Sequence, residues 1–269
     1  MANTDLEMLS DWDAETDFLS AALRRVGNGR TLEILEAGCG QQWPLDVEGL
    51  SYRLTGIDLD ADALAMRVEQ GDLDEVIHGD LRTAELPDEQ FDVIYNSFVI
   101  EHIDGAADVL DNFVRWVKPG GVILIRFPDR DSVFGFITRI TPHWFHVLYK
   151  RWIIGNKNAG KPGHEPYETF YDPVVSRQGF TDYCARNGLV IQEERGFPVS
   201  EAAEGLKLKV AVMAAKALGA LSFGKLASHH MWLTYVVTKP VNPRTPSTDI
   251  ATDTATATAT ATATDTASS

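Results

Sequence analysis

Residues 32–41 read Leu-Glu-Ile-Leu-Glu-Ala-Gly-Cys-Gly-Gln, and the rest of the chain is organised around them. The first half predicts a short buried strand that ends at the acidic residue Glu36. Gly38 and Gly40 predict a tight turn, because glycine adopts positive φ and its missing Cβ lets a ligand approach the backbone. A strand that runs into a Gly-x-Gly turn is typical of nucleotide-cofactor sites, although a turn without any ligand has the same pattern.

The composition is that of an ordinary globular protein, with 269 residues, 44% hydrophobic and 23% charged. Its two cysteines, Cys39 and Cys184, cannot build a disulfide framework and show no metal-ligand spacing, so we expect no metal. The first 20 residues lack a signal-peptide pattern, and no apolar run is long enough to span a membrane. We therefore expect a cytoplasmic protein.

Charge is distributed unevenly around the net value of −15. Residues 132–164 and 205–248 contain eleven Lys and Arg residues but no Asp or Glu. The remaining chain keeps 13 cations against all 39 acids. This remaining part of the chain is acidic enough to repel phosphate backbones, which argues against nucleic acid as a partner. The two basic segments suit an anionic substrate or a membrane surface.

Apolar patterns predict strands that alternate with helices, as in βαβ units around a parallel sheet. The expected strands lie at 32–36, 54–58, 76–77, 91–96, 122–127, 189–197 and 231–238, and the expected helices at 14–26, 61–70, 104–118, 174–187 and 201–221. In the second helix, Leu64 and Val68 are expected to face the core, and His229 and His230 are expected to be exposed.

The chain divides by composition into three parts. Residues 1–13 are polar and are interpreted as an N-terminal extension, and 14–240 as one domain. Within that domain, residues about 128–174 form an aromatic excursion that we interpret as a lid. Residues 241–269 are mostly Thr/Ala repeats without an amphipathic pattern, so we expect a disordered tail.

Polar residues follow the predicted strands at regular places. Asp58 ends the second strand, 18 residues after Gly40, where a carboxylate can accept hydrogen bonds from both ribose hydroxyls. Asp80 follows the third strand, placed to accept from an exocyclic amine of a purine. Asn96 ends the fourth strand. Parallel strands end at one edge of the sheet, so these residues predict one ligand site.

With these landmarks the chain resembles the class I S-adenosylmethionine-dependent methyltransferases, especially the small-molecule group with a Gly-Cys-Gly signature. The matching stretches are Leu35–Gly40, Thr55–Asp58, Gly79–Leu81, Phe91–Asn96 with Glu101–Ile103, and Val117–Gly121. The resemblance implies a Rossmann-like, doubly wound, seven-stranded α/β sheet, mostly parallel with an antiparallel last strand. One departure is Gln42 at the third glycine position, followed by Trp43 and Pro44.

The resemblance also implies S-adenosylmethionine as cofactor and assigns roles to residues of this chain. Glu36, Gly38, Cys39 and Gly40 would cradle the methionine half. Asp58 would hold the ribose and Leu59 would lie against the adenine, whose edge would meet Asp80 and Leu81. Asn96 would lie near the sulfonium or the methionine amine.

A nicotinamide dehydrogenase is the rival interpretation of the glycine turn. Its third glycine would fall at Trp43, whose ring would obstruct a pyrophosphate. Glu36 would also repel a diphosphate, whereas it suits a cationic methionine amine. These two residues favour S-adenosylmethionine.

The acceptor must be recognised by the excursion, because the glycine turn and its neighbours serve the cofactor. Methyl transfer needs a general base only if the acceptor must lose a proton. The candidates for such a base are His143, His146 and His164, since histidine titrates near neutral pH. The candidate substrate contacts are Trp144, Tyr149, Tyr167 and Tyr171, which indicate an apolar or aromatic small-molecule acceptor.

Two alternatives stay open. The basic and aromatic excursion, extended by the 206–221 helix with its stripe of Leu206, Val210, Met213, Ala217 and Leu221, would also suit peripheral membrane contact and a lipid or glycan acceptor. The chain could alternatively bind the cofactor without catalysis. The oligomeric state is not predicted.

Overall fold

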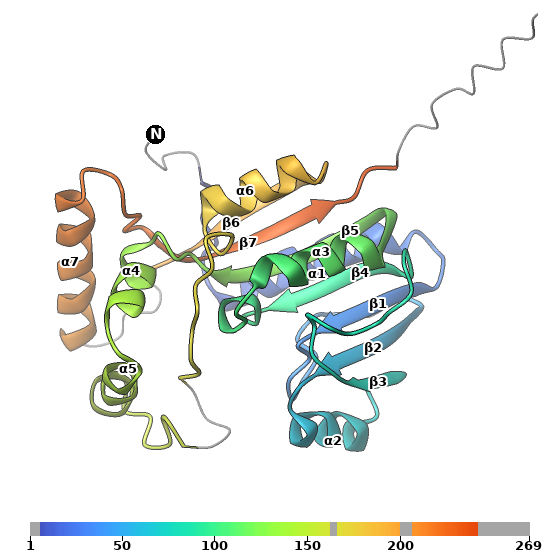
Figure 1. Cartoon of the computed structure of the whole chain (residues 1–269), viewed down its shortest axis with the longest axis horizontal. Coiled ribbons are helices and arrows are strands. Elements are labelled where there is room, and N and C mark those ends of the chain that lie inside the picture. Colours follow the sequence, from blue (N-terminus) through green and yellow to red (C-terminus); the bar gives the residue numbers. More distant parts are fainter. Residues whose placement is uncertain (1–5, 162–165, 200–205, 242–269) are drawn as a thin grey trace, which may run out of the picture.

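The computed structural model describes residues 6–161, 166–199 and 206–241, and these residues are built around one seven-stranded sheet. The strands are β1 (Leu32–Ala37), β2 (Tyr52–Asp58), β3 (Glu75–His78), β4 (Phe91–Ser97), β5 (Val117–Pro128), β6 (Val190–Pro198) and β7 (His230–Thr238). Their spatial order is β3-β2-β1-β4-β5-β7-β6 (Figure 1). β1 to β5 pair in parallel, and β7 runs antiparallel to both of its neighbours. The predicted α/β sheet is confirmed.

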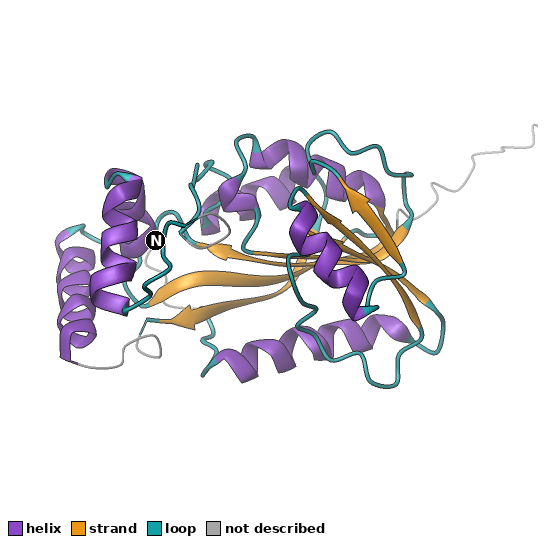
Figure 2. Cartoon of the chain, turned by 90° about the horizontal axis from the view of Figure 1, so that it is seen from below, coloured by secondary structure: helices purple, strands orange, loops and turns teal. Residues whose placement is uncertain are grey.

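Helices cover both faces of the sheet, as Figure 2 shows. They are α1 (Trp12–Gly27), α2 (Ala61–Gln70), α3 (Ala106–Trp116) and α6 (Arg177–Arg186). Successive strand residues point to opposite faces, so Ile34 of β1 packs in the same cluster as Leu23 of α1, and Leu35 packs with Phe113 of α3. The central strands β1 and β4 are therefore buried on both faces and lack a polar alternation, whereas β3 and β6 at the two edges of the sheet are partly exposed.

The α2 helix begins and ends where the sequence predicts. The Asp60 carboxylate accepts hydrogen bonds from the N–H groups of Asp62 and Ala63, and the helix ends at Gly71, whose φ is 69°. Leu64 is buried as expected, but Val68 is 59% exposed, so that prediction is wrong. Arg67 occupies the inner face in its place and is 0% exposed.

The segment before α1 belongs in part to the folded body. Leu6 and Leu9 are buried, and Met8 bridges Gly196 of β6. The α1 helix starts at Trp12, two residues before the predicted Ala14, because the Asp11 carboxylate accepts from the N–H of Ala14 at 2.8 Å. The expected extension over residues 1–13 is thus corrected from Leu6 onward. The expected tail lies, from residue 242 onward, outside the described residues.

The excursion after β5 is helical in its first half. It holds α4 (Val133–Ile140), α5 (His143–Tyr149) and η2, a π-helical turn (Lys150–Ile154). A fourth segment, α7 (Leu206–Leu221), lies against α4 although it follows β6 in the chain. All four lie at one end of the molecule, beyond the carboxyl ends of the parallel strands (Figure 1). We call α4, α5, η2 and α7 the lid.

A buried carboxylate ties α1 to the sheet. Glu15 is 0% exposed and accepts a hydrogen bond from Arg126 of β5 at 2.7 Å. It also accepts from the Trp232 indole N–H at 3.0 Å and from the Thr234 hydroxyl, both on β7. Satisfying the carboxylate on all sides is what makes its burial tolerable.

The substitution Glu15→Ala should lower the free energy of unfolding by about 3–5 kcal/mol, because it leaves the Arg126 guanidinium buried without its counter-charge. Urea unfolding followed by circular dichroism measures this difference. The matched control is Glu48→Ala, at an exposed site, which should leave the midpoint unchanged. Equal midpoints for both variants would contradict the role of Glu15.

Candidate functional site

The carboxyl ends of four neighbouring strands bring the predicted polar residues to one edge of the sheet. In the strand register, Ala37 pairs with Ile57 and Asp58 pairs with His78. The glycine turn, Asp58 and the Asp80 loop therefore follow one another along this edge, and Asn96 lies at the end of β4 beside β1. The structure thus assembles the cofactor residues that the sequence predicted.

Glycine is required at the two positions of the turn for different physical reasons. Gly38 has φ 77°, and a Cβ there would lie 2.4 Å from the Val99 side chain, so packing alone requires glycine. Gly40 has φ 53°, but a Cβ there would meet nothing within 4 Å. The backbone at Gly40 therefore faces open space, as a turn that cradles a ligand must.

The Asp58 carboxylate organises this turn. Its Oδ2 accepts from the N–H of Gly40 at 2.8 Å, and its Oδ1 accepts from the N–H of Asp60 at 2.9 Å. Each oxygen retains a second lone pair, and the side chain is only half-buried. Leu59, the next residue, is 62% exposed and presents an apolar surface beside it.

Glu36 lies inside the protein and is 3% exposed. Its Oε2 pairs with the Arg67 guanidinium at 2.9 Å. Arg67 also pairs with Asp72 at 2.9 Å and donates to the Cys39 carbonyl at 2.8 Å. Burial raises the pKa of Glu36 to about 8, against the opposing effect of Arg67. The expectation that Glu36 faces a methionine amine is corrected, since the carboxyl faces Arg67.

The remaining cofactor candidates divide into buried and accessible groups. Asn96 is fully buried and donates to the Ala37 carbonyl at 2.8 Å, while its Oδ1 has no hydrogen-bond partner among the described residues. Asp80 is half-buried and pairs with Arg82 at 2.6 Å, which lowers its pKa. Leu81 is 5% exposed and offers little surface to a ligand. Cys39 is 3% exposed, and burial raises its thiol pKa to about 12.

Of the proposed histidine bases, His143 and His146 lie on α5 and not at this edge (Figure 1). His143 is exposed on α5, and His146 shares a 2.7 Å hydrogen bond with the Thr141 hydroxyl. In Figure 1 the α5 helix lies apart from the ends of β1 and β2. Trp144 is 62% exposed and Tyr149 is half-buried on the same helix. His164 lies outside the described residues.

Tyr167 and Tyr171 lie instead against η1 (Ile100–His102), the short turn that follows β4. The Tyr167 ring packs edge-on against His102, with 5.7 Å between centroids, and the His102 Nδ1 lies 2.7 Å from the Glu168 carbonyl oxygen. Tyr171 is 6% exposed, and burial raises the pKa of its hydroxyl, with a smaller contribution from Glu101. The two tyrosines therefore pack at η1, and the residue before η1, Val99, is the one whose side chain packs at Gly38 of the glycine turn.

Glu101 is a candidate site residue to which the sequence analysis gives no role, although it lies in one of the stretches that match the family. It is 2% exposed, and its Oε2 has no hydrogen-bond partner among the described residues. Its Oε1 lies 3.7 Å from the His102 Nε2. Burial raises the pKa of Glu101 to about 8. The available signal was an acid four residues after the end of β4, in the turn that leaves the carboxyl edge of the sheet.

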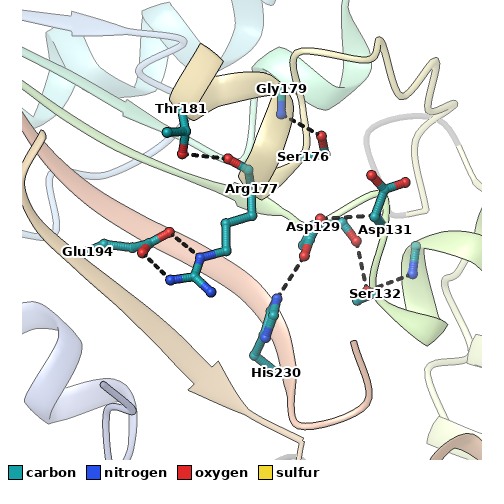
Figure 3. Close-up of polar contacts among 10 residues, drawn as sticks. Asp129, Asp131, Ser132, Ser176, Arg177, Gly179, Thr181, Glu194 and His230 are labelled. Carbon is teal, nitrogen blue, oxygen red and sulfur yellow. Dashed lines mark hydrogen bonds and ion pairs between the residues drawn. The ribbon is translucent and has the colours of Figure 1, made fainter. Parts of the chain in front are cut away.

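His230, predicted to be exposed, is buried at the start of β7. Its Nε2 lies 2.7 Å from the Asp129 Oδ2, just past the end of β5, as Figure 3 shows. Asp129 also accepts from the Asp131 N–H at 3.0 Å, and its carbonyl accepts from the Ser132 hydroxyl at 2.7 Å. The pair therefore fixes the point where the lid leaves the sheet.

Comparison with known proteins finds similarity in the first half of the chain. Residues 35–125 match the model of a methyltransferase domain. A Mycolicibacterium smegmatis protein named "Probable S-adenosylmethionine-dependent methyltransferase" is 34% identical over 99 residues, which cover 36% of this chain and 38% of that protein. The malonyl-[acyl-carrier protein] O-methyltransferase of Enterobacter lignolyticus is 26% identical over 118 residues, 42% of this chain and 45% of that one.

Among solved structures, the [4+2]-cyclase SpnF shares the fold with a TM-score of 0.53 and 14% identity, covering 89% of both chains. Residues 35–125 are thus similar to a methyltransferase domain, and the whole sheet shares its fold with this solved structure. It spans less than half the length of the two curated relatives, and the matches leave most of the lid uncovered.

The substitution Glu101→Gln should remove a pH-dependent loss of stability. Below the ordinary carboxyl pKa of 4.5 both states hold the proton. As the pH rises toward about 8, the unfolded state releases it and the folded state keeps it, so wild-type stability falls. Urea midpoints measured across this range should diverge, with the variant more stable at the alkaline end. Parallel curves, or the same divergence in the exposed Glu168→Gln control, would contradict the assignment.

Proposed function

We propose that this chain is an S-adenosylmethionine-dependent methyltransferase that acts on a small, apolar or aromatic acceptor. The observation that carries the proposal is the open backbone surface at Gly40, held by Asp58 at the carboxyl edge of the sheet. The match of residues 35–125 to a methyltransferase domain supports the same conclusion.

The residues present fit this cofactor better than a dinucleotide. Asp58 keeps free lone pairs for ribose hydroxyls, and Leu59 lies exposed beside it for the adenine. The unpartnered Asn96 Oδ1 offers a buried acceptor near the glycine turn, suited to an ammonium group. Trp43 stands where a dinucleotide-binding turn has its third glycine, and a tryptophan does not suit that position. Its ring packs on the core, edge-on to Tyr95 at 5.5 Å between centroids.

S-adenosylmethionine, when bound, supplies a methyl group on a sulfonium that is already a good leaving group. The protein therefore has to place the acceptor in line and exclude water. Within the described lid, Phe145, Leu148, Tyr149 and Trp152 line an open apolar hollow, which favours an apolar acceptor. If the acceptor must lose a proton, the Glu101–His102 pair suits this better than His143 or His146, because it borders the glycine turn.

A second candidate is a protein that binds S-adenosylmethionine without transferring its methyl group. The fold similarity to a protein described as a [4+2]-cyclase favours this second candidate, because one fold can serve several functions. The lid then would shape a different reaction or none.

The substitution Asp58→Asn should weaken binding of S-adenosylhomocysteine, the demethylated cofactor, by about 10–100-fold, since hydrogen bonds to a charged acceptor contribute about 1.5–3 kcal/mol. Isothermal titration calorimetry measures the affinity. Thermal unfolding must accompany it, because Asp58 also holds the Gly40 N–H. Asp62→Asn, on the exposed first turn of α2, is the matched control and should bind like the wild type.

Methyl transfer itself is tested by incubating the full chain with methyl-labelled S-adenosylmethionine and fractions of apolar small-molecule extracts. Label should pass into an extractable product with the wild type and the Asp62→Asn control, and far more slowly with Asp58→Asn. Tight cofactor binding with no labelled product from any fraction would favour the binding protein instead.

A further inference from the structure

The outer surface of the lid carries large apolar side chains that nothing in the described structure covers. On α5 and η2, Trp144 is 62%, Phe145 43%, Leu148 43% and Trp152 76% exposed. Trp144 and Phe145 pack edge-on against each other, with centroids 6.2 Å apart. A contiguous apolar patch of this kind marks an interaction surface rather than ordinary scatter.

The α7 helix exposes a second apolar surface. The stripe predicted from its sequence faces outward, with Val210 at 57%, Met213 at 71% and Leu221 at 72% exposure, and Phe223 just beyond the helix is 95% exposed. The reason lies in the opposite face, where Ala215 and Gly219 are buried. A Cβ at Gly219 would lie 2.5 Å from the Ser228 Cβ and 3.4 Å from a Val133 methyl of α4, so the face of α7 that is packed inside carries small residues.

Basic residues surround both surfaces. Arg151, Lys157 and Lys161 are exposed near η2, and Lys209 and Lys216 are exposed on α7. No Asp or Glu occurs in residues 132–161 or 206–229, which hold the lid helices, so all 39 acids lie elsewhere in the chain. Lys239 follows the far end of β7, where it pairs with Glu89 of the acidic body. α5 and α7 lie at the same end of the molecule in Figures 1 and 2. The protein is therefore polarised, with a basic, apolar end and an acidic body.

We propose that the lid docks on the surface of an anionic lipid bilayer. Lysine and arginine interact with acidic headgroups, while tryptophan and phenylalanine insert at the headgroup boundary. The acidic body is repelled by the same surface, so the lid and the carboxyl edge of the sheet face the membrane. No helix among the described residues is long and apolar enough to cross a bilayer, so the contact is peripheral.

A second copy of the chain fits this surface less well. A two-fold interface would bring the same lysines and arginines of both copies together, without one acidic side chain from either basic segment to neutralise them. An anionic membrane removes this repulsion. The docking does not depend on methyl transfer, but it would bring an apolar acceptor dissolved in the bilayer directly to the lid.

The test is co-sedimentation of the full chain with vesicles of phosphatidylcholine alone or mixed with phosphatidylglycerol. We expect binding to the mixed vesicles, weakened about tenfold or more by high salt, and little binding to phosphatidylcholine. Lys209→Glu with Lys216→Glu should reduce the affinity at least about tenfold. Arg53→Glu, an exposed charge reversal on β2, is the matched control and should not reduce it.

The apolar contribution is tested with Trp144→Ser plus Trp152→Ser, which should lower the affinity and diminish the blue shift of tryptophan fluorescence on binding. Val76→Ser on β3, 38% exposed, is its control. Absence of binding by the folded wild type would overturn the proposal, as would affinities unchanged in both lid variants. A dimer seen by light scattering that Trp144→Ser plus Trp152→Ser dissociates would assign the surface to a second copy instead.

Discussion

The buried Arg67 guanidinium is the interaction on which the ligand-binding edge depends. It pairs with Glu36 at the end of β1 and with Asp72 after α2, and it donates to the Cys39 carbonyl within the glycine turn. One cation thus pairs with two acids and binds the turn to the helix that follows β2. Charges buried this deeply persist only when they are paired on all sides.

This arrangement changes the roles of the two acids that flank the turn. Glu36 supports the turn from inside, whereas Asp58 holds the Gly40 N–H and remains accessible from outside. An acid at the end of a strand can therefore contact a ligand or support the structure. In this chain the difference is that the buried cation Arg67 pairs with Glu36 and not with Asp58.

The glycine turn of the sheet has strict backbone and packing requirements, whereas the outer surface of the lid has few. Positive φ at Gly38 and the Val99 packing against it leave no freedom at the turn. The lid instead packs through small residues such as Gly219 and leaves its larger apolar side chains outside. An apolar surface of that kind suits an apolar partner, whether a small acceptor or a bilayer.

The sequence alone determined the sheet and the position of its ligand edge. Apolar runs, glycine turns and strand-end acids are local signals, and the βαβ order brings their ends together whatever the details of packing. The Asp60 cap and the Gly71 end of α2 are equally local and are confirmed. The same signals placed Asp58, Asp80 and Asn96 at one edge.

Only the tertiary structure decided which side of each helix faces inward and which polar groups are buried. Val68 and Arg67 are neighbours on α2, and the arginine is inside because Glu36 and Asp72 supply its counter-charges. His230 can be buried because its Nε2 forms a hydrogen bond with the carboxylate of Asp129, 101 residues earlier in the chain. The α7 stripe faces outward because the small residues Ala215 and Gly219 form the packed face, where a Cβ at Gly219 would lie 2.5 Å from the Ser228 side chain. Such partners are distant in sequence, and periodicity carries no information about them.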